Sequence, residues 1–225
     1  MQFIRFIKYF HYLASNWNIA IARHILVHER RGEKKYGIDT TGADKLESLY
    51  AKGIDIDHST IYMPASYDLL EDIFERFKIG SYKHFVDIGC GKGRVLCVAA
   101  FYGVSRLTGV ELSKEFCEAS RKNLAVVKQT FPALEYSIKH NDAFYFDIPD
   151  DADCIFMFNP FDEIIMSGVV TNIERSLEDN PREITIIYFN PMQKHLFLEQ
   201  DYKLLHHQQL MTYLEAVILR KSPGV

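Results

Sequence analysis

Three alternating glycines stand between an apolar strand and an apolar helix near residue 90, and this junction restricts the fold more than any other part of the chain. Residues 85–88 are typical of a buried parallel strand, and residues 95–101 continue as the apolar side of a helix. Gly89, Gly91 and Gly93 permit a turn with positive φ angles and let a ligand approach the backbone. The junction therefore predicts a strand–turn–helix unit of a parallel α/β sheet, with a ligand over the turn.

An acidic residue, Asp87, lies inside this strand just before the turn. A carboxylate at the end of a strand repels a pyrophosphate lying over the loop, but it attracts an amino or sulfonium group. The turn therefore favours a cationic ligand over a dinucleotide.

This stretch resembles the first motif of the class I S-adenosylmethionine-dependent methyltransferases, which is an acidic residue followed by Gly-x-Gly-x-Gly. Residues 87–93 match the motif fully. The resemblance implies that Asp87 approaches the methionine amino group and that a loop passes beneath the ligand, formed by Gly89, Cys90, Gly91 and Gly93. The alternative is a glycine turn that only packs a helix on a strand, because a bare glycine pattern is weak evidence.

A second strand, residues 107–111, ends in Glu111 twenty residues after Gly91. One carboxylate can accept hydrogen bonds from both ribose hydroxyls, so Glu111 is our candidate for that contact, with Leu112 beside it. NAD-binding folds place an acid at the same spacing, so Glu111 alone does not separate the two ligands. The structural alternative is an acid favoured by the helix dipole before Ser113.

The third match is the turn of residues 140–143, which follows a strand over residues 136–139. The resemblance implies that Asp142 accepts from the adenine amino group and that the backbone beside it, at Asn141 and Ala143, faces the ring. Asn-Asp pairs are also common in ordinary turns, so a plain turn is the alternative.

A fourth strand, residues 154–158, ends abruptly in Asn159, Pro160 and Phe161. Methyl transfer needs a nucleophile lone pair aligned with the carbon–sulfur bond. For an amine, the carbonyls of Asn159 and Pro160 accept its N–H bonds, and Phe161 forms an aromatic wall that tolerates the developing cation. The pattern is similar to the Asn/Asp-Pro-Pro-aromatic motif of amino methyltransferases, with one proline in place of two. A turn that closes a buried strand is the alternative.

An apolar strand over residues 184–189 ends in a second Asn-Pro pair, Asn190 and Pro191. Ligands bind beyond the carboxyl ends of the strands in doubly wound sheets, so this pair is expected to line the substrate side of the same cleft. Alternatively, Pro191 takes the first position of a helix that continues over residues 192–198. Both interpretations remain open.

The composition fits one globular domain with an attachment: 225 residues, 48% apolar, 25% charged, with a formal net charge of −4. No run reaches the roughly eighteen apolar residues of a membrane helix.

The four cysteines form no Cys-x-x-Cys pair, which predicts reduced thiols in a cytoplasmic protein. No metal site is expected, because only His24 and His28 share a helix face and no zinc-protease arrangement of carboxylates accompanies them.

The charge pattern disfavours nucleic acid as the partner. The densest basic stretch, residues 28–35, contains two acids of its own and is typical of a solvated helix end. An amine-bearing protein or small molecule is the expected acceptor instead.

Residues 1–60 are expected to form an attachment to a catalytic domain of residues 61–225. Apolar residues at alternating spacings of four and three predict a helix with one apolar face, formed by Phe3, Ile7, Phe10, Ala14, Trp17 and Ile21. This helix covers the catalytic domain, pairs with another chain or lies on an anionic membrane, so peripheral membrane binding or self-association through residues 1–28 stays open. Residues 31–60 are expected to be a linker with a short helix near residues 45–52.

A proline-containing segment, residues 61–67, precedes a predicted amphipathic helix with Ser66 as its N-cap. The segment is similar to one in lysine methyltransferases of the Dot1-like and ATP-synthase-c-subunit type, where it closes over the cofactor. The resemblance implies that Tyr62 and Tyr67 form a roof over the site, and core packing of the two tyrosines is the alternative.

The remaining pattern predicts helices over residues 113–129 and 164–177 and two tightly joined final strands, residues 202–210 and 212–219. A tight join makes those two strands antiparallel. The resemblance implies an α/β fold, a Rossmann-like doubly wound seven-stranded sheet of order 3-2-1-4-5-7-6 with strand 7 antiparallel. We therefore expect an S-adenosylmethionine-dependent methyltransferase that acts on a protein lysine or other amine. The alternatives are a non-catalytic S-adenosylmethionine-binding scaffold or regulatory protein and, third, a dinucleotide oxidoreductase.

Overall fold

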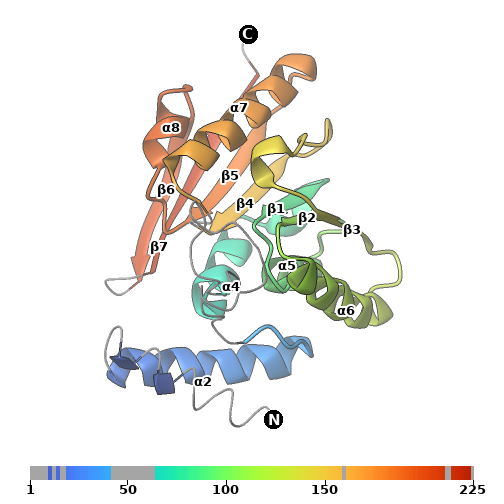
Figure 1. Cartoon of the computed structure of the whole chain (residues 1–225), viewed down its shortest axis with the longest axis vertical. Helices are drawn as coiled ribbons and strands as arrows, with labels where there is room; N and C mark the ends of the chain where they lie inside the picture. Colours follow the sequence, from blue (N-terminus) through green and yellow to red (C-terminus); the bar gives the residue numbers. More distant parts are fainter. Residues whose placement is uncertain are drawn as a thin grey trace.

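Seven strands form one sheet in the computed structural model, which describes residues 10–11, 14–15, 19–41, 64–158, 161–210 and 214–223 (Figure 1). The strands are β1 (Phe85–Ile88), β2 (Arg106–Glu111), β3 (Glu135–His140), β4 (Cys154–Phe158), β5 (Ile184–Phe189), β6 (Lys203–Leu210) and β7 (Leu214–Lys221). Their order across the sheet is β3-β2-β1-β4-β5-β7-β6, which confirms the predicted Rossmann-like arrangement.

Helices cover both faces of the sheet. One face packs against α4 (Tyr67–Arg76), α5 (Arg94–Phe101) and α6 (Lys114–Thr130). The other packs against η2 (Ala143–Tyr145), α7 (Glu163–Asp179) and α8 (Lys194–Leu198). A short helix, η1 (Ile79–Ser81), precedes β1, and α2 (Ile19–Tyr36) lies beyond α4 and α5, away from the sheet (Figure 1).

Alternation along the strands divides the apolar side chains between two cores. Phe85 belongs to the core on the α5 side, whereas Val86 and Ile88 belong to the core on the α7 side, as the two-residue period of a strand requires. β1 and β5 are buried on both faces, which is usual for parallel strands covered by helices. Asp87 is the exception within β1, because it is a carboxylate and is buried all the same.

The parallel strands bring their carboxyl ends together at one edge of the sheet. Ile88, at the end of β1, pairs with Val110 of β2 on one side and with Met157 of β4 on the other. Strand β7 is antiparallel to both β5 and β6, which confirms the predicted reversed strand. This carboxyl edge therefore gathers the glycine turn, the end of β2 and the end of β4.

Helix α2 continues through the first part of the stretch that was expected to be a linker. Its polar residues contact α4: the Arg31 guanidinium pairs with the Asp68 carboxylate at 3.1 Å. A Cβ on Gly32 would lie 2.2 Å from the ring of Tyr67, so glycine allows α2 and α4 to approach closely. The prediction of a linker over residues 31–36 is wrong, because the polar residues and the glycine there serve helix–helix packing.

Three local expectations differ in detail. Tyr67 is fully buried, so the core-packing alternative holds for this tyrosine and it forms no roof. Ser66 occupies the N-cap position of α4 but makes no side-chain capping bond. Helix α8 begins only at Lys194, so Pro191 is not its first residue; the positive φ of Asn190, 48°, turns the chain before the helix can start.

Some expectations fall outside the described residues, namely most of the apolar face in residues 1–17, the short helix near residues 45–52, and Tyr62. The division of the chain at residue 60 lies there too and stays a prediction. Within the ranges given above, no helix combines the length and the apolar character needed to span a bilayer. The same residues contain no group of three His, Cys, Asp or Glu side chains placed to hold a metal ion. All four cysteines are buried and free.

Candidate functional site

The turn between β1 and α5 uses its own amide groups to hold its shape. Gly89, Gly91 and Gly93 have φ angles of 79°, 52° and 80°, in the left-handed region that favours glycine. The amides of Gly89 and Cys90 both donate to the Val110 carbonyl at 2.9 Å, and the Gly93 amide donates to the Cys90 carbonyl at 2.8 Å. These amides are satisfied within the protein, whereas a loop that binds pyrophosphate offers its amides to the ligand.

Two glycines let neighbouring elements approach the turn. A Cβ on Gly93 would lie 2.4 Å from the Ser120 hydroxyl of α6, and a Cβ on Gly109 of β2 would lie 2.7 Å from the Cys90 sulfur. The Cys90 side chain therefore points toward β2, and its burial raises the pKa of the thiol well above the ordinary value. The contact predicted between Cys90 and the cofactor therefore involves the backbone of Cys90, and it stays a prediction.

Asp87 is a buried carboxylate with one oxygen that lacks a partner. The residue is 2% exposed, and Oδ2 makes no hydrogen bond to any group of the described residues. Burial, and then the charge of Glu111, raises the pKa of Asp87 well above its ordinary value. A cationic donor placed against Oδ2 relieves both the lost hydration and the missing hydrogen bond.

Glu111 is held at the end of β2 by backbone amides on two sides. Its Oε2 accepts from the Gly91 amide at 2.9 Å, and its Oε1 accepts from the Ser113 amide at 2.7 Å. Burial raises the pKa of Glu111, and these two hydrogen bonds oppose the shift. Each carboxylate oxygen keeps a second lone pair, so Glu111 can accept two further hydrogen bonds from a pair of hydroxyls.

This pair of carboxylates fits S-adenosylmethionine. The methionine amino group is a cationic donor suited to the unpartnered oxygen of Asp87, and the ribose hydroxyls are two donors suited to Glu111. A pyrophosphate would instead place more negative charge against Asp87, which argues against the dinucleotide alternative.

The turn after β3 is tied to the end of β2. The Asn141 amide donates to the Glu111 carbonyl at 3.2 Å. The Asp142 carboxylate caps η2 by accepting from a backbone amide at 2.9 Å, so part of the plain-turn alternative also holds. Four predicted residues thus stand near Glu111, although their contacts with an adenine ring stay a prediction: Leu112, Asn141, Asp142 and Ala143.

The residues predicted to act on the methyl acceptor are only partly described. Asn159 and Pro160 lie outside the described residues, as does Tyr62 of the cofactor set. Phe161 is half-buried and packs against the core on the α7 side. The assignment of Asn159, Pro160 and Phe161 to catalysis therefore stays a prediction.

The sequence analysis missed a buried polar cluster next to the turn. Arg94, the first residue of α5, is 2% exposed and pairs with Glu29 and Glu33 of α2. The signal in the sequence is a single charged residue that opens an otherwise apolar helix, a pattern equally typical of a solvated helix start. The partners of Arg94 are visible only once the chain has folded.

Comparison with known proteins gives one family and a set of similar folds. The family model described as histone methylation protein DOT1 matches residues 43–174, more than half of the chain. A search of curated protein sequences gave no match. The ribosomal protein L11 methylase from Lactobacillus delbrueckii subsp. bulgaricus superposes with a TM-score of 0.52 at 12% identity, covering 70% of this chain and 79% of that one.

An RNA methyltransferase from Salinibacter ruber, in complex with S-adenosyl-L-homocysteine, superposes with a TM-score of 0.50 at 16% identity, covering 72% of this chain and 94% of that one. At such low identities the structural likeness shows the fold alone. The family match is made on the sequence itself, and it spans the glycine turn, Asp87, Glu111 and the turn after β3. The chain therefore belongs to the family of the histone methylation protein DOT1 and is an S-adenosylmethionine-dependent methyltransferase.

Proposed function

We propose that this methyltransferase transfers the methyl group to nitrogen, with a protein lysine or another amine as the acceptor. The description of the family names methylation of a protein, the histone, which supports a protein acceptor. The sequence Asn159-Pro160-Phe161 after β4 supports an amine. S-adenosylmethionine supplies a methyl group on a positively charged sulfur when it is bound, and the protein has to position the nucleophile.

The family match is the observation that carries this proposal, and the sheet topology indicates where the acceptor approaches the cofactor. β4 lies next to β1, and Met157 of β4 pairs with Ile88 at the mouth of the glycine turn. β5 lies next to β4, and Phe158 pairs with Phe189, so the residues that follow these two strands start from the same edge. An acceptor that enters over β4 and β5 therefore meets the cofactor from the side opposite to Glu111.

An amine nucleophile needs acceptors for its N–H bonds and a site that tolerates positive charge. The side-chain carbonyl of Asn159 and the backbone carbonyl of Pro160 are the expected acceptors, because an oxygen lone pair orients the amine and proline adds no competing amide. Phe161 supplies an aromatic face for the cation that develops. Burial of Asp87 with an unpartnered oxygen keeps the cationic part of the cofactor on the β1 side.

Incorporation of a labelled methyl group tests the proposal. The purified protein is incubated with tritiated S-adenosylmethionine and a cell lysate, which is then separated into protein, nucleic acid and small molecules. We expect label in the protein or small-amine fraction, and methyl-lysine after acid hydrolysis of labelled protein. Label confined to nucleic acid would contradict a protein or small-molecule acceptor.

Two asparagine variants make the assay specific. Asn159→Ala is expected to lower labelling about 100-fold, since misplacement of a nucleophile has an effect of that order. Asn180→Ala is the matched control, because Asn180 is exposed and ends α7 close to the amino edge of β5. If the chain is instead a non-catalytic scaffold, the unaltered protein and both variants should bind the cofactor, and none of them should transfer label to an acceptor.

The exposed side of α2 helps to decide between the two partners expected for residues 1–28, which are a membrane surface and a second copy of the chain. Ile19, Arg23, Val27, Arg30 and Lys34 are all exposed, and their spacings of three and four place them in one stripe. A stripe that combines aliphatic and basic side chains suits the surface of an anionic membrane. We therefore place membrane contact ahead of self-association for this end of the chain.

A further inference from the structure

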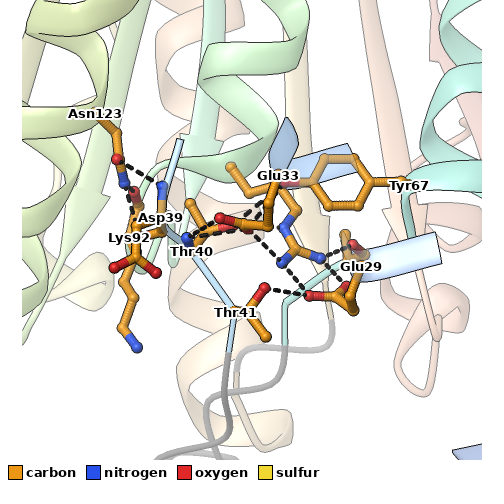
Figure 2. A network of polar contacts seen from close by, with 10 residues as sticks. Glu29, Glu33, Asp39, Thr40, Thr41, Tyr67, Lys92 and Asn123 are labelled. Atoms are coloured by element: carbon orange, nitrogen blue, oxygen red, sulfur yellow. Dashed lines mark hydrogen bonds and ion pairs between the residues drawn. The ribbon is translucent and has the colours of Figure 1, made fainter. Parts of the chain in front are cut away.

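We propose that Arg94 and Asn123 are positioning residues for the cofactor loop, through which residues 29–41 hold the glycine turn in its ligand-binding shape. Figure 2 shows this network, with Asn123, Asp39 and Lys92 on one side and Glu29 and Tyr67 on the other. The proposal concerns cofactor binding and is independent of the identity of the methyl acceptor.

Arg94 follows Gly93 directly and carries the guanidinium at the centre of the network. Its Nε donates to the Thr40 hydroxyl at 2.8 Å, and its Nη1 donates to the Ala65 carbonyl at 2.8 Å. Its Nη2 donates to Glu29 Oε2 at 2.6 Å, and its Nη1 contacts the other oxygen of Glu29. The guanidinium and the Glu29 carboxylate thus form a two-pronged pair, the strongest geometry available to these groups.

The carboxylates that face Arg94 are themselves fully supported. Glu33 accepts from the Thr40 amide at 2.9 Å and from the Tyr67 hydroxyl at 3.1 Å. Glu29 accepts from the Thr41 hydroxyl at 3.0 Å. Each member of the network therefore fixes the orientation of its neighbours, which is what a fully satisfied buried polar network does best.

Such a network is poorly explained by stability alone. Arg94 and Glu29 are each 3% exposed in their side chains, and removing two charges from water offsets most of their attraction. The ring of Tyr67 lies 4.2 Å from the Arg94 guanidinium and further limits where the guanidinium can move. A role in fixing the start of α5 accounts for these features.

Asn123 of α6 holds the loop at a second point. Its side-chain amide donates to the Lys92 carbonyl at 2.9 Å and to the Asp39 carbonyl at 3.2 Å, while its oxygen accepts from the Asp39 amide at 3.1 Å. Lys92 lies between Gly91 and Gly93, so the hydrogen bond fixes a peptide group inside the turn. Three segments that are distant in sequence meet at this one side chain.

The turn needs this external support because it is made largely of glycine. Gly91 and Gly93 both adopt positive φ angles, and glycine loses more conformational freedom on ordering than any other residue. The Gly91 amide has to reach Glu111, so an error in the turn also displaces the carboxylate expected to bind ribose. If the turn is already ordered before the cofactor arrives, less conformational entropy is lost on binding.

Arg182 provides a matched control for a purely structural role. Its guanidinium donates to the carbonyls of Ala152, Ser176 and Asn180 at 2.7–2.9 Å, so it resembles Arg94 in the number of its hydrogen bonds. It precedes β5 and therefore lies at the amino edge of the sheet, away from the glycine turn. A change at Arg182 should affect folding without affecting the cofactor.

The test compares cofactor affinity with thermal stability in full-length variants. Thr40→Val keeps the shape of the side chain but removes the hydroxyl that binds Arg94, and Thr40→Ser restores the hydroxyl. Asn123→Ala removes the hold on Lys92. We expect Thr40→Val and Asn123→Ala each to weaken S-adenosylmethionine binding about tenfold in calorimetry, because the hydrogen bonds that each variant loses hold the turn in its ligand-binding shape.

Two further measurements distinguish positioning from packing. Amide hydrogen exchange within residues 91–93 should become faster in Thr40→Val and return to the original rate in Thr40→Ser. Arg182→Lys should lower the melting temperature and leave the affinity unchanged. The proposal is overturned if Thr40→Val and Asn123→Ala lower the melting temperature as Arg182→Lys does while cofactor affinity stays the same. Should Asn123→Ala fail to fold, the Thr40 pair decides the question alone.

Discussion

Replacing Asp87 by asparagine is expected to make the protein more stable and far weaker in cofactor binding. The Asp87 carboxylate is buried, Oδ2 has no partner among the described residues, and Glu111 adds a like charge nearby. Both burial and that charge raise the pKa of Asp87 in the folded state. The stability linked to this group is therefore present below the unfolded pKa of about 3.9 and is lost as the pH rises through the folded pKa.

The two effects have different magnitudes because the stability depends on the buried charge of Asp87 and the cofactor affinity depends on its unpartnered oxygen. Asparagine keeps the shape and still leaves a buried polar group without a partner, but it removes the buried charge and the repulsion between that charge and Glu111. We expect a gain of about 1 kcal/mol at neutral pH for Asp87→Asn, which raises the melting temperature by about 2–4 °C for a chain of this size. A hydrogen bond to a charged group contributes about 1.5–3 kcal/mol, so losing the methionine amino contact weakens binding about 10- to 150-fold.

Scanning calorimetry over a pH series and titration calorimetry measure the two effects separately. The melting temperature of the unaltered protein without cofactor should fall as the pH rises through the folded pKa of Asp87, and Asp87→Asn should flatten that slope. Titrations in two buffers of different ionisation enthalpy should show protons released on binding to the unaltered protein below that pKa. A variant that melts lower than the unaltered protein and binds S-adenosylmethionine equally well would refute the assignment of Asp87.

Three other changes test the neighbouring features. Glu111→Gln should weaken cofactor binding about tenfold in calorimetry, because the new amide nitrogen cannot accept from Gly91 or Ser113, and unchanged affinity would contradict the role of Glu111. Gly109→Ala should lower the free energy of unfolding in urea by about 1–3 kcal/mol, because the Cβ of the new alanine would overlap the Cys90 sulfur. A variant as stable as the unaltered protein would rule out this close packing. Replacing Arg23, Arg30 and Lys34 by glutamate should abolish cosedimentation of the protein with vesicles of anionic phospholipid and leave the cofactor affinity unchanged. If the variant sediments with the vesicles as the unaltered protein does, α2 does not contact the membrane.

The strands and the positions of Asp87 and Glu111 beside the glycine turn could be predicted because their signals are local, whereas the order of the strands came from the family resemblance. The apolar strand before the glycines, the reversed strand after a tight join and the spacing from Gly91 to Glu111 are all readable over short stretches. Asp87 and Glu111 also stand at or near strand ends, where parallel topology brings side chains to one edge.

The contacts of residues 29–41 could not be predicted in the same way. Glu29 and Arg94 are 65 residues apart, and Asp39 and Asn123 are 84 residues apart, so no local period encodes their pairing. A polar stretch that contains Gly32 has the composition of a loop, and its close packing against Tyr67 cannot be recognised from the local sequence. The alternative in which Pro191 begins a helix is wrong for a related reason: the chain turns at Asn190 with a positive φ angle, and α8 begins only at Lys194.

Strand β6 is synthesised before β7 but reaches the sheet only through it. On the ribosome, β5 therefore emerges with an open edge, and residues 203–210 have no strand to pair with until residues 214–221 have left the exit tunnel. We expect the nascent chain to be most prone to aggregation during that interval, so translation products stalled before β7 should be found bound to chaperones.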